Sequence, residues 1–474
     1  SAPQAVVERT FSVKLRAVQS RGRGVASITR GALAADRAAT LPQSLAKLGA
    51  TVSFAQNVRH VDSKLVSKTP LVLDNRYSTT GPYWFTDLKQ AYGYPSYQTA
   101  NGTGRTVAVV IDSDILDSDL ALYFGHEHLA PPVVERRPVD GGPQPFDPTS
   151  GSSAESSLDV QQSFGSAPGA HIMLYGVPDL SDQSVIDAYS AIVEDNRADV
   201  VSSSFGVCEL YYTAAYQNGT DYTSILEAQH DVMRQGNAQG ITFVAASGDS
   251  GAYECFDPTG SYMIKGVGNP ADDTAVTSVG GTDLVTASTA GSKNSSYTRE
   301  SEFYDPLDPS QGYPPNAIWG SGGGISQLFP KPLYQQLVNT RAHTRTVPDV
   351  AMHMGGCPVG AASCNPDDSS VVVGFAGGLY LLIGTSASSP EFAGLLAVTE
   401  QTLGTRLGNA NYYIYALSAV GGSAVYRQNI PGDNGYPATP GYNYVLGNGT
   451  PRAAVFAAQP LAPRAGNPQT PTNP

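Results

Sequence analysis

Charged residues are scarce in this chain: Asp, Glu, Lys and Arg together make up 15% of its 474 residues. Acids outnumber bases, and the formal net charge at pH 7 is -13. A nucleic-acid-binding surface needs an excess of Lys and Arg, so this balance argues against one and fits tolerance of acid. Glycine (50), proline (34) and tyrosine (26) are plentiful instead, which indicates an ordered, loop-rich protein.

Long apolar runs are also lacking. The longest one, residues 371–383, is too short and too rich in glycine to span a bilayer, so we expect no membrane segment. No signal peptide stands at Ser1, and any export signal is expected to have been removed already or never to have been part of this sequence.

Cysteine is rare, with four residues in the chain, and none of them has the spacing of a metal site. Cys357 and Cys364 are close enough in sequence to close a small loop, while Cys208 and Cys255 each follow a predicted strand. The even number favours a secreted protein with two disulfides over one with free thiols.

The two ends of the chain differ from its body. Residues 1–66 are the most basic part, and their apolar residues alternate like a strand between Val6 and Val18. A basic segment ahead of an acidic body suggests an intramolecular partner held partly by charge. Residues 458–474 are rich in proline and have no apolar period, which predicts a disordered tail or linker.

Apolar strands alternate with helices in the body of the chain. This alternation predicts an α/β fold with a doubly wound, mostly parallel sheet and helices on both faces. Functional loops are then expected at the carboxyl ends of the strands. Strands are predicted at residues 105–112, 170–177, 199–205 and 241–247, and helices at residues 153–164, 183–196 and 223–239.

One stretch offers a side chain for covalent chemistry: Gly384-Thr385-Ser386-Ala387. An apolar run ends at Gly384 and an amphipathic helical pattern begins just beyond, so Ser386 is expected at a helix N-terminus. Unpaired amides and the positive end of the helix dipole favour negative charge developing there on a substrate oxygen. On these residues alone, a simple N-cap role for Thr385 or Ser386 is an equal alternative.

A serine hydroxyl needs a base, and the histidines do not offer one. None of the seven stands in the His-Gly-Thr-His context that a subtilisin-like base occupies. Glu155 and Asp159, four residues apart on a predicted helix, project from one face. If they are partly buried, they cannot both ionise easily, so one proton tends to be retained. Taken alone, the pair fits a solvated helix face better.

A third acid follows a buried strand pattern. Asp249 lies in the tight glycine turn Ser247-Gly248-Asp249-Ser250-Gly251. If it faces Ser386 and is protonated, it can donate a hydrogen bond to a tetrahedral oxyanion. Taken alone, Asp249 fits a loop cap equally well.

Together these stretches resemble the sedolisin family of serine-carboxyl peptidases, which have a subtilisin-like fold. The resemblance covers roughly residues 78–457, and the motifs occur in the family's order. They are Glu155-x-x-x-Asp159, Ser247-Gly248-Asp249-Ser250-Gly251, Val279-Gly280-Gly281-Thr282, Gly322-Gly323-Gly324-x-Ser326, Pro348-Asp349-Val350-Ala351 and Gly384-Thr385-Ser386-Ala387.

The resemblance implies a role for each candidate catalytic residue. Ser386 is the expected nucleophile, Glu155 the general base and then acid, Asp159 its orienting partner, and Asp249 the oxyanion donor. A bound peptide is expected to lie as an added strand along the stretch Ser204, Phe205 and Gly206. We therefore expect a secreted, monomeric endopeptidase that works in acid by acyl transfer.

Three alternatives stay open at this point. Within the family, the chain could be a tripeptidyl-peptidase that trims N-termini. It could also be a catalytically inactive fold kept as a binding module, although all four catalytic positions are filled. A histidine-dependent subtilase is less well supported, because its histidine motif is absent from the sequence.

The resemblance also identifies residues 1–66 as the latter part of a sedolisin-type prodomain and residues 67–457 as the peptidase domain. A prodomain is an intramolecular partner that must be released, so a maturation cut is expected between about Ser63 and Tyr77.

The family usually binds calcium near its C-terminus through carboxylates. The corresponding stretches here carry the amides Gln428, Asn429 and Asn443. Calcium prefers charged oxygen ligands, so we predict no tightly bound calcium and no other cofactor. Asp433 is the residue that could restore such a site.

Overall fold

The computed structural model describes most of the body of the chain and short parts of its N-terminal segment. These are residues 4–11, 13–17, 33–35, 59–61, 64–65, 80–288, 294–302, 304–307, 310, 313–356 and 369–459. Cys357, Cys364, most of the stretch expected to contain the maturation cut and nearly all of the predicted tail lie outside the described residues.

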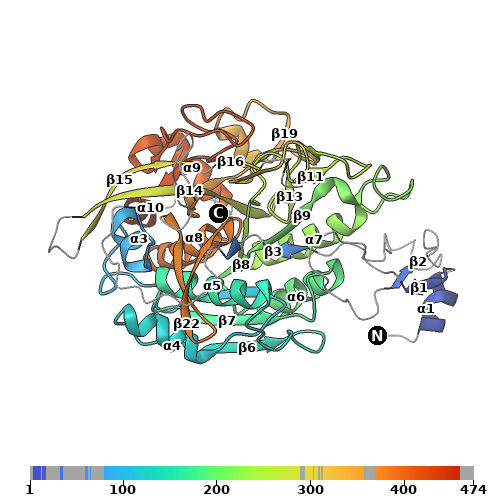
Figure 1. The fold of residues 1–474 in the computed structure, drawn as a ribbon, viewed down its shortest axis with the longest axis horizontal. Helices are drawn as coiled ribbons and strands as arrows, with labels where there is room; N and C mark the ends of the chain where they lie inside the picture. Colours follow the sequence, from blue (N-terminus) through green and yellow to red (C-terminus); the bar gives the residue numbers. More distant parts are fainter. Residues whose placement is uncertain are drawn as a thin grey trace, which may run out of the picture.

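A mostly parallel sheet forms the centre of the molecule. In Figure 1, β6 and β7 lie at its lower edge, β8 in the middle, and β14 and β15 toward the upper left. The strand order is β15-β14-β10-β8-β5-β7-β6, with β20 paired to β14, and only the β14–β15 pair is antiparallel. The strands are β5 (Thr106–Ile111), β6 (Val134–Pro138), β7 (His171–Gly176), β8 (Val200–Ser203), β10 (Thr242–Ala246), β14 (Val276–Ser288), β15 (Ser295–Ser301) and β20 (Val350–His353).

Helices cover both faces of this sheet, as the alternating pattern predicts. Alternate residues of the central strand β5 enter two different cores. Val107 and Val109 pack on the side of α5 (Gly151–Ser166) and α8 (Thr385–Leu403). Ala108 and Val110 pack on the side of α6 (Asp182–Asp195) and α7 (Ser224–Gln239). A strand buried on both faces explains why its sequence is continuously apolar.

The remaining elements surround this layered centre. Two further sheets have three strands each: β13 (Gly268–Asn269), β9 (Phe205–Cys208) and β3 (His60–Val61) form one, and β21 (Val371–Phe375), β22 (Gly378–Ile383) and β4 (Lys64–Leu65) form the other. The others are α3 (Phe85–Tyr92), α4 (Asp117–His126), α9 (Asn411–Gly421), α10 (Ala453–Ala457), β11 (Cys255–Phe256), β12 (Met263–Ile264), β16 (Tyr304–Pro306), β17 (Ile318–Gly320), β18 (Gly324–Pro330), β19 (Thr344–Val347), β23 (Tyr426–Arg427) and β24 (Thr450–Pro451), with 3-10 turns Glu209–Tyr212, Leu333–Leu337 and Gly422–Ala424.

The predicted strand between Val6 and Val18 is wrong in its first half. Helix α1 (Gln4–Phe11) stands there, and only β1 (Leu15–Ala17) is extended, paired with β2 (Leu33–Ala35). Val7 and Phe11 fit a two-residue alternation, but they are also four residues apart and therefore share one helix face.

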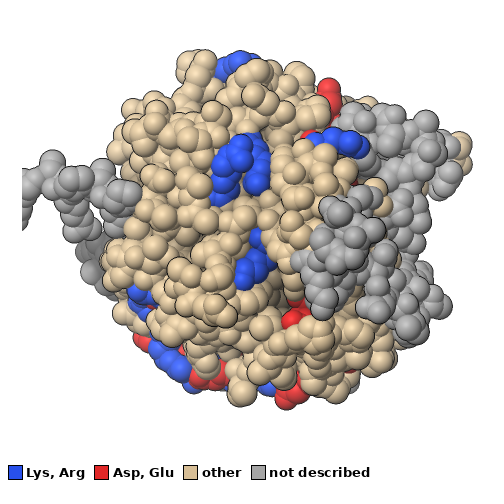
Figure 2. All heavy atoms as spheres, turned by 90° about the vertical axis from the view of Figure 1, so that its left-hand side faces the viewer, with Lys and Arg blue, Asp and Glu red and all other residues tan. Residues whose placement is uncertain are grey.

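The molecular surface reflects the low charge content. Figure 2 shows the face that lies on the left of Figure 1: uncharged residues make up most of it, and Lys and Arg form a few separate clusters among the residues drawn in colour. Among the helices of the described residues, none is both long enough and apolar enough to cross a membrane.

Candidate active site

Ser386 lies in the first turn of α8, directly after the buried strand β22, which confirms the predicted helix N-terminus. Gly384 connects strand and helix with a φ of 139°, a conformation that favours glycine. The Ser386 side chain is buried, and its Oγ donates to the backbone carbonyl of Ser204 at 3.5 Å. The nucleophile candidate therefore lies at the carboxyl edge of the parallel sheet, just beyond β8.

Glu155 and Asp159 both lie on α5 with 0% of their surface exposed, so the solvated-face alternative is wrong. Some of the polar side chains of this buried helix find partners inside the protein. Ser156 donates to the carbonyl of Ser113 at 2.8 Å, and the amide of Gln161 both donates to and accepts from the backbone of residue 374 at 2.8 Å. Paired polar groups can be buried at little net cost.

Asp159 is held by the strand that was expected to receive the substrate. Its Oδ1 accepts a hydrogen bond of 2.6 Å from the Ser204 hydroxyl. Burial raises the pKa of Asp159 well above its usual value, and the charge of Glu155 adds to this rise, while the bond from Ser204 opposes it. Ser204 therefore touches two candidate catalytic residues, Asp159 through its hydroxyl and Ser386 through its carbonyl.

Asp249 follows β10 and lies against the start of α8. Its Oδ1 accepts hydrogen bonds from the backbone N–H of Thr385 at 2.7 Å and from the Thr385 hydroxyl at 2.9 Å. Its Oδ2 has no hydrogen-bond partner among the described residues. Burial raises the pKa of Asp249 well above its usual value, with further contributions from the charges of Glu254 and Glu155. A buried, protonated Oδ2 is suited to donate to an oxyanion.

Glu155 influences the protonation of both aspartates, Asp159 and Asp249. The charge of Glu155 raises the pKa of both Asp159 and Asp249, although these residues come from different elements. The four predicted catalytic residues are therefore grouped around the N-terminus of α8. Sequence analysis missed the hydroxyl of Ser204 as a partner of Asp159. The only available signal was its position at the end of the predicted strand.

The glycine run around Gly322 packs against the turn that holds Asp249. The N–H of Gly322 donates to the carbonyl of Gly248 at 2.7 Å. A Cβ at Gly322 would lie 2.1 Å from the backbone oxygen of Ser247, which is closer than any real contact. The glycines of this motif therefore keep the Asp249 turn in place and offer no side-chain chemistry of their own.

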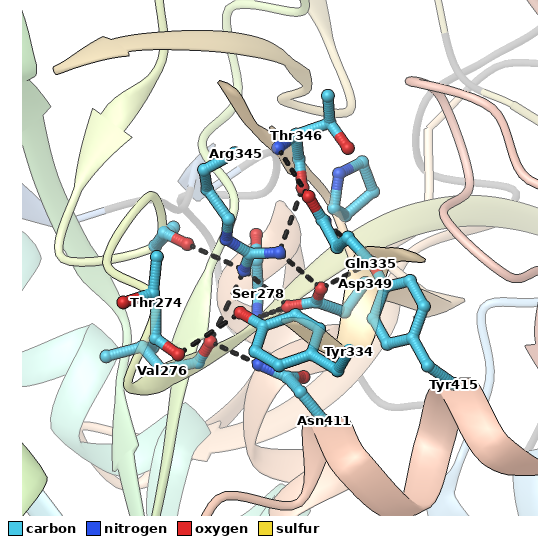
Figure 3. Close-up of polar contacts among 12 residues, drawn as sticks. Thr274, Val276, Ser278, Tyr334, Gln335, Arg345, Thr346, Asp349, Asn411 and Tyr415 are labelled. Carbon is cyan, nitrogen blue, oxygen red and sulfur yellow. Dashed lines mark hydrogen bonds and ion pairs between the residues drawn. The ribbon is translucent and has the colours of Figure 1, made fainter. Parts of the chain in front are cut away.

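The acid of the Pro348-Asp349-Val350-Ala351 motif has a structural role (Figure 3). The fully buried Arg345 contacts both of its oxygens, with Nη1 2.5 Å from Oδ1 and Nη2 2.6 Å from Oδ2. Asp349 also accepts from the backbone of Ser278 at 2.8 Å and from the hydroxyl of Tyr415 at 2.7 Å. It thereby connects β14, β20 and α9.

Two short strands of the N-terminal segment flank the centre. β3 pairs antiparallel with β9, with His60 opposite Gly206 and Val61 opposite Phe205. β4 pairs with the end of β22, where Lys64 lies opposite Ile383. Figure 1 shows the blue β3 arrow beside β9. β3 therefore occupies the edge of the stretch Ser204, Phe205 and Gly206, where sequence analysis expects a bound peptide.

A disulfide joins Cys208 to Cys255, at the ends of 47 residues of chain. One of the two expected disulfides is thus present in the structure. The pair Cys357 and Cys364 lies outside the described residues.

Asn443, in the stretch expected to correspond to the family's calcium site, has an amide that is fully engaged within the protein. Asn443 Oδ1 accepts from the backbone of Val445 and Leu446, both at 3.0 Å. Its Nδ2 donates to the carbonyls of Thr439 at 2.9 Å and Gly441 at 3.3 Å. An N–H donor thus points at oxygens of the kind that would bind calcium. Within the described residues, no three Asp, Glu, His or Cys side chains gather in a metal-binding group.

Comparison with known proteins places this geometry in a family. The model of the subtilase family matches residues 149–412, which is more than half of the chain. Kumamolisin from Bacillus sp. (strain MN-32) is 29% identical over 401 residues, covering 81% of this chain and 64% of kumamolisin. Sedolisin from Pseudomonas sp. (strain 101) is 28% identical, covering 87% of this chain and 65% of that protein. Human tripeptidyl-peptidase 1 is 25% identical, covering 79% of this chain and 64% of that protein.

The chain therefore spans less than two thirds of the length of these curated relatives. Among solved structures, Pseudomonas sedolisin in complex with two molecules of pseudo-iodotyrostatin superimposes with a TM-score of 0.67 at 26% identity, over 80% of this chain and 98% of that one. The subtilisin-like α/β fold is thus confirmed. The chain belongs to the subtilase family, and its expected place in the sedolisin family of serine-carboxyl peptidases is confirmed.

Proposed function

We propose that the chain is a secreted endopeptidase that cleaves peptide bonds in acid through an acyl-enzyme on Ser386. The observation that carries the proposal is the grouping of three buried acids, two of them with strongly raised pKa values, around a buried serine at a helix N-terminus. Such grouped, perturbed acids are typical of catalytic sites.

The reaction begins when Ser386 Oγ attacks the carbonyl carbon of a peptide bond and its proton passes to Glu155. The carbonyl oxygen becomes an oxyanion, which accepts a hydrogen bond from protonated Asp249. The C–N bond then breaks, and the leaving amine takes the proton from Glu155. Water attacks the resulting ester and gives a proton to Glu155. The acid product departs and Ser386 recovers its proton.

The required protonation states set the working pH. Glu155 must be ionised to accept a proton, while Asp249 must be protonated to donate a hydrogen bond. Both conditions hold together only near carboxyl pKa values. Because the pKa of Asp249 is raised by burial, the donor keeps its proton above the ordinary range of an aspartic acid. At neutral to alkaline pH its ionised form would repel the oxyanion.

We assign residues 1–66 as an inhibitory prodomain segment within the same proposal. The pairing of β3 with β9 supports this assignment, because it fills the backbone hydrogen bonds that a bound peptide would use. The maturation cut is proposed to follow this segment. We further propose that the mature enzyme is monomeric, acts on unfolded proteins and binds no calcium.

The function is tested by first incubating the purified full chain in acid until residues 1–66 are released, and then adding an unfolded protein substrate at pH 4 and at pH 8. We expect faster cleavage at pH 4 and none by the Ser386→Ala variant. Equal rates at both pH values, or activity that survives Ser386→Ala, would refute the proposal. Mass spectrometry of the products identifies internal cuts, whereas successive losses of three residues would assign the protein as a tripeptidyl-peptidase.

A further inference from the structure

Arg59, just before β3, inserts its side chain into a closed polar pocket beside β9. The guanidinium is fully buried, with Nη1 2.8 Å from Oδ1 of Asp182. Its Nη2 donates to Oε1 of Gln229 at 2.6 Å, to Oδ1 of Asn269 at 3.0 Å and to the hydroxyl of Tyr212 at 3.3 Å. We call these four residues the Arg59 pocket.

The Arg59 pocket is built to present acceptor oxygens. The Tyr212 hydroxyl donates to Asp182 Oδ1 at 2.5 Å, so its own proton is already engaged. Asn269 Nδ2 donates to Oδ1 of Asp272 at 3.0 Å, which turns its carbonyl oxygen toward the guanidinium. Gln229 Nε2 donates to that same oxygen of Asn269 at 3.2 Å. The pocket therefore suits a planar cation with several N–H groups, which arginine provides and lysine does not.

The pocket residues all belong to the body of the chain. Asp182 begins α6, Gln229 lies in α7 and Asn269 lies in β13, the strand that pairs with the other edge of β9. Asp182 and Gln229 are fully buried. When Arg59 leaves, the buried carboxylate of Asp182 loses its cation, which is costly unless another cation takes that place.

The register of β3 places the pocket relative to Ser386. His60 lies opposite Gly206 and Val61 opposite Phe205 in an antiparallel pair. In this register, the residue that follows the one opposite Phe205 faces Ser204 in any bound strand. The carbonyl of Ser204 is 3.5 Å from Ser386 Oγ. A peptide that pairs with β9 in the same way would carry the residue in the Arg59 pocket three positions before the residue that faces Ser204.

We propose that the Arg59 pocket is a specificity site for substrates with arginine three residues N-terminal to the residue whose carbonyl Ser386 attacks. The inference rests on the peptidase function proposed above. Arg59 occupies the same site in the full chain, so the N-terminal segment and the substrate compete for it.

The test compares peptides that differ only at this position: arginine, citrulline, lysine or norleucine. Citrulline keeps the shape of arginine but has no charge. A further peptide carries the arginine one residue closer to the cut. Cleavage is measured at pH 4, after release of residues 1–66, with the full chain and with the full-length Arg59→Gln variant, in which any N-terminal segment that stays bound has no arginine for the pocket.

We expect kcat/KM to be about tenfold higher or more for the arginine peptide than for the citrulline peptide, since a charged hydrogen-bonded contact is worth about 1.5–3 kcal/mol. Asp182→Asn should bring this ratio close to one. The matched control is Asp187→Asn on the same helix, where the carboxylate accepts from Gln183 at 2.7 Å, and it should keep the ratio.

Equal cleavage of the arginine and citrulline peptides by both proteins would overturn the inference while leaving the peptidase function intact. A preference for the shifted arginine would overturn the assigned register. If no peptide in the set is cleaved after incubation at pH 4 has released residues 1–66, as mass spectrometry of the protein would show, the peptidase function fails, and the specificity with it. The peptide series uses proteins with an intact pocket, so it gives an answer even if Asp182→Asn does not fold.

Discussion

Thr385 holds one carboxylate oxygen of Asp249 through two hydrogen bonds, from its backbone N–H at 2.7 Å and its hydroxyl at 2.9 Å. Both bonds favour the ionised form and lower the pKa of Asp249, whereas burial, the larger effect, raises it. The residue before the proposed nucleophile therefore adjusts the pH at which Asp249, the proposed oxyanion donor, loses its proton.

Thr385→Val removes the hydroxyl but keeps the backbone N–H and the side-chain shape. We expect Asp249 to hold its proton to higher pH, so the alkaline limit of activity should move upward by up to about one pH unit. The pH profile of kcat/KM measures this shift. An unchanged or lowered alkaline limit would contradict the role of Asp249 as a protonated donor.

Ser204→Ala removes the hydroxyl that donates to Asp159 at 2.6 Å. Asp159 then loses a fixed orientation, and we expect kcat to fall about 3- to 10-fold, in line with the loss of one hydrogen bond to a neutral group. Ser202→Ala is the matched control, because the Ser202 hydroxyl contacts that of Ser389 at 3.3 Å and not an acid. Equal effects of both variants on kcat would show that Ser204 acts only through packing.

Several buried acids link stability to pH. Burial raises the pKa of Asp283 to about 7 and that of Glu400 to about 8. The folded protein therefore binds more protons than the unfolded chain above about pH 4, so stability should fall as pH rises toward 8. Burial lowers the pKa of His353 to about 3, so this residue makes stability rise with pH up to about pH 6.5. The buried acids outnumber it, and we expect their effect on stability to dominate.

Unfolding midpoints at pH 4, 6 and 8 measure this dependence. The Ser386→Ala variant should be used, so that self-digestion does not interfere. We expect the highest midpoint at the acid end of the series. A midpoint that rises steadily from pH 4 to pH 8 would mean that the buried acids are ionised in the folded state.

Arg345→Met leaves the buried carboxylate of Asp349 without its cation. Removing one partner of a buried pair costs about 3–5 kcal/mol of unfolding free energy. The double variant Arg345→Met with Asp349→Asn should be less destabilised than Arg345→Met alone, because no uncompensated charge remains. Urea unfolding in the Ser386→Ala background compares the two, and equal losses would argue against a charge effect.

Asn443→Asp tests why calcium is not expected to bind. The change removes the N–H donor to the carbonyls of Thr439 and Gly441 and adds a negative charge beside them. We expect a loss of about 1–3 kcal/mol without calcium and partial recovery with millimolar calcium. The unchanged protein should have the same unfolding midpoint with calcium and with a chelator. A fall on chelation would refute the proposed absence of calcium.

The sequence predicts the layered core well and marks the candidate catalytic acids, because both depend on local patterns. The apolar run of β5 and the four-residue spacing of Glu155 and Asp159 are visible without coordinates. The burial of the acid pair was not predictable, since it depends on α5 packing against α8 and the sheet. Taken alone, two acids four residues apart are more typical of a solvent-exposed helix face.

Contacts between distant segments account for most of what the sequence could not predict. Arg59 lies 123 residues from Asp182 and 210 from Asn269, so neither spacing nor composition relates them. Asp349 belongs to a motif that supported the family resemblance, yet only its contacts with Arg345 and Tyr415 reveal a structural role. In the N-terminal segment, Val7 and Phe11 fit both periods, and the pattern alone could not decide between strand and helix.

The disulfide between Cys208 and Cys255 has a consequence for the enzyme after maturation. Cys208 ends β9, the strand proposed to bind the peptide, and Cys255 follows the turn of Asp249 by a few residues. A covalent bond thus connects the edge proposed to bind the peptide to the turn of the proposed oxyanion donor. If the N-terminal segment departs as proposed and its backbone pairing is lost, this crosslink limits how far the two parts can move apart.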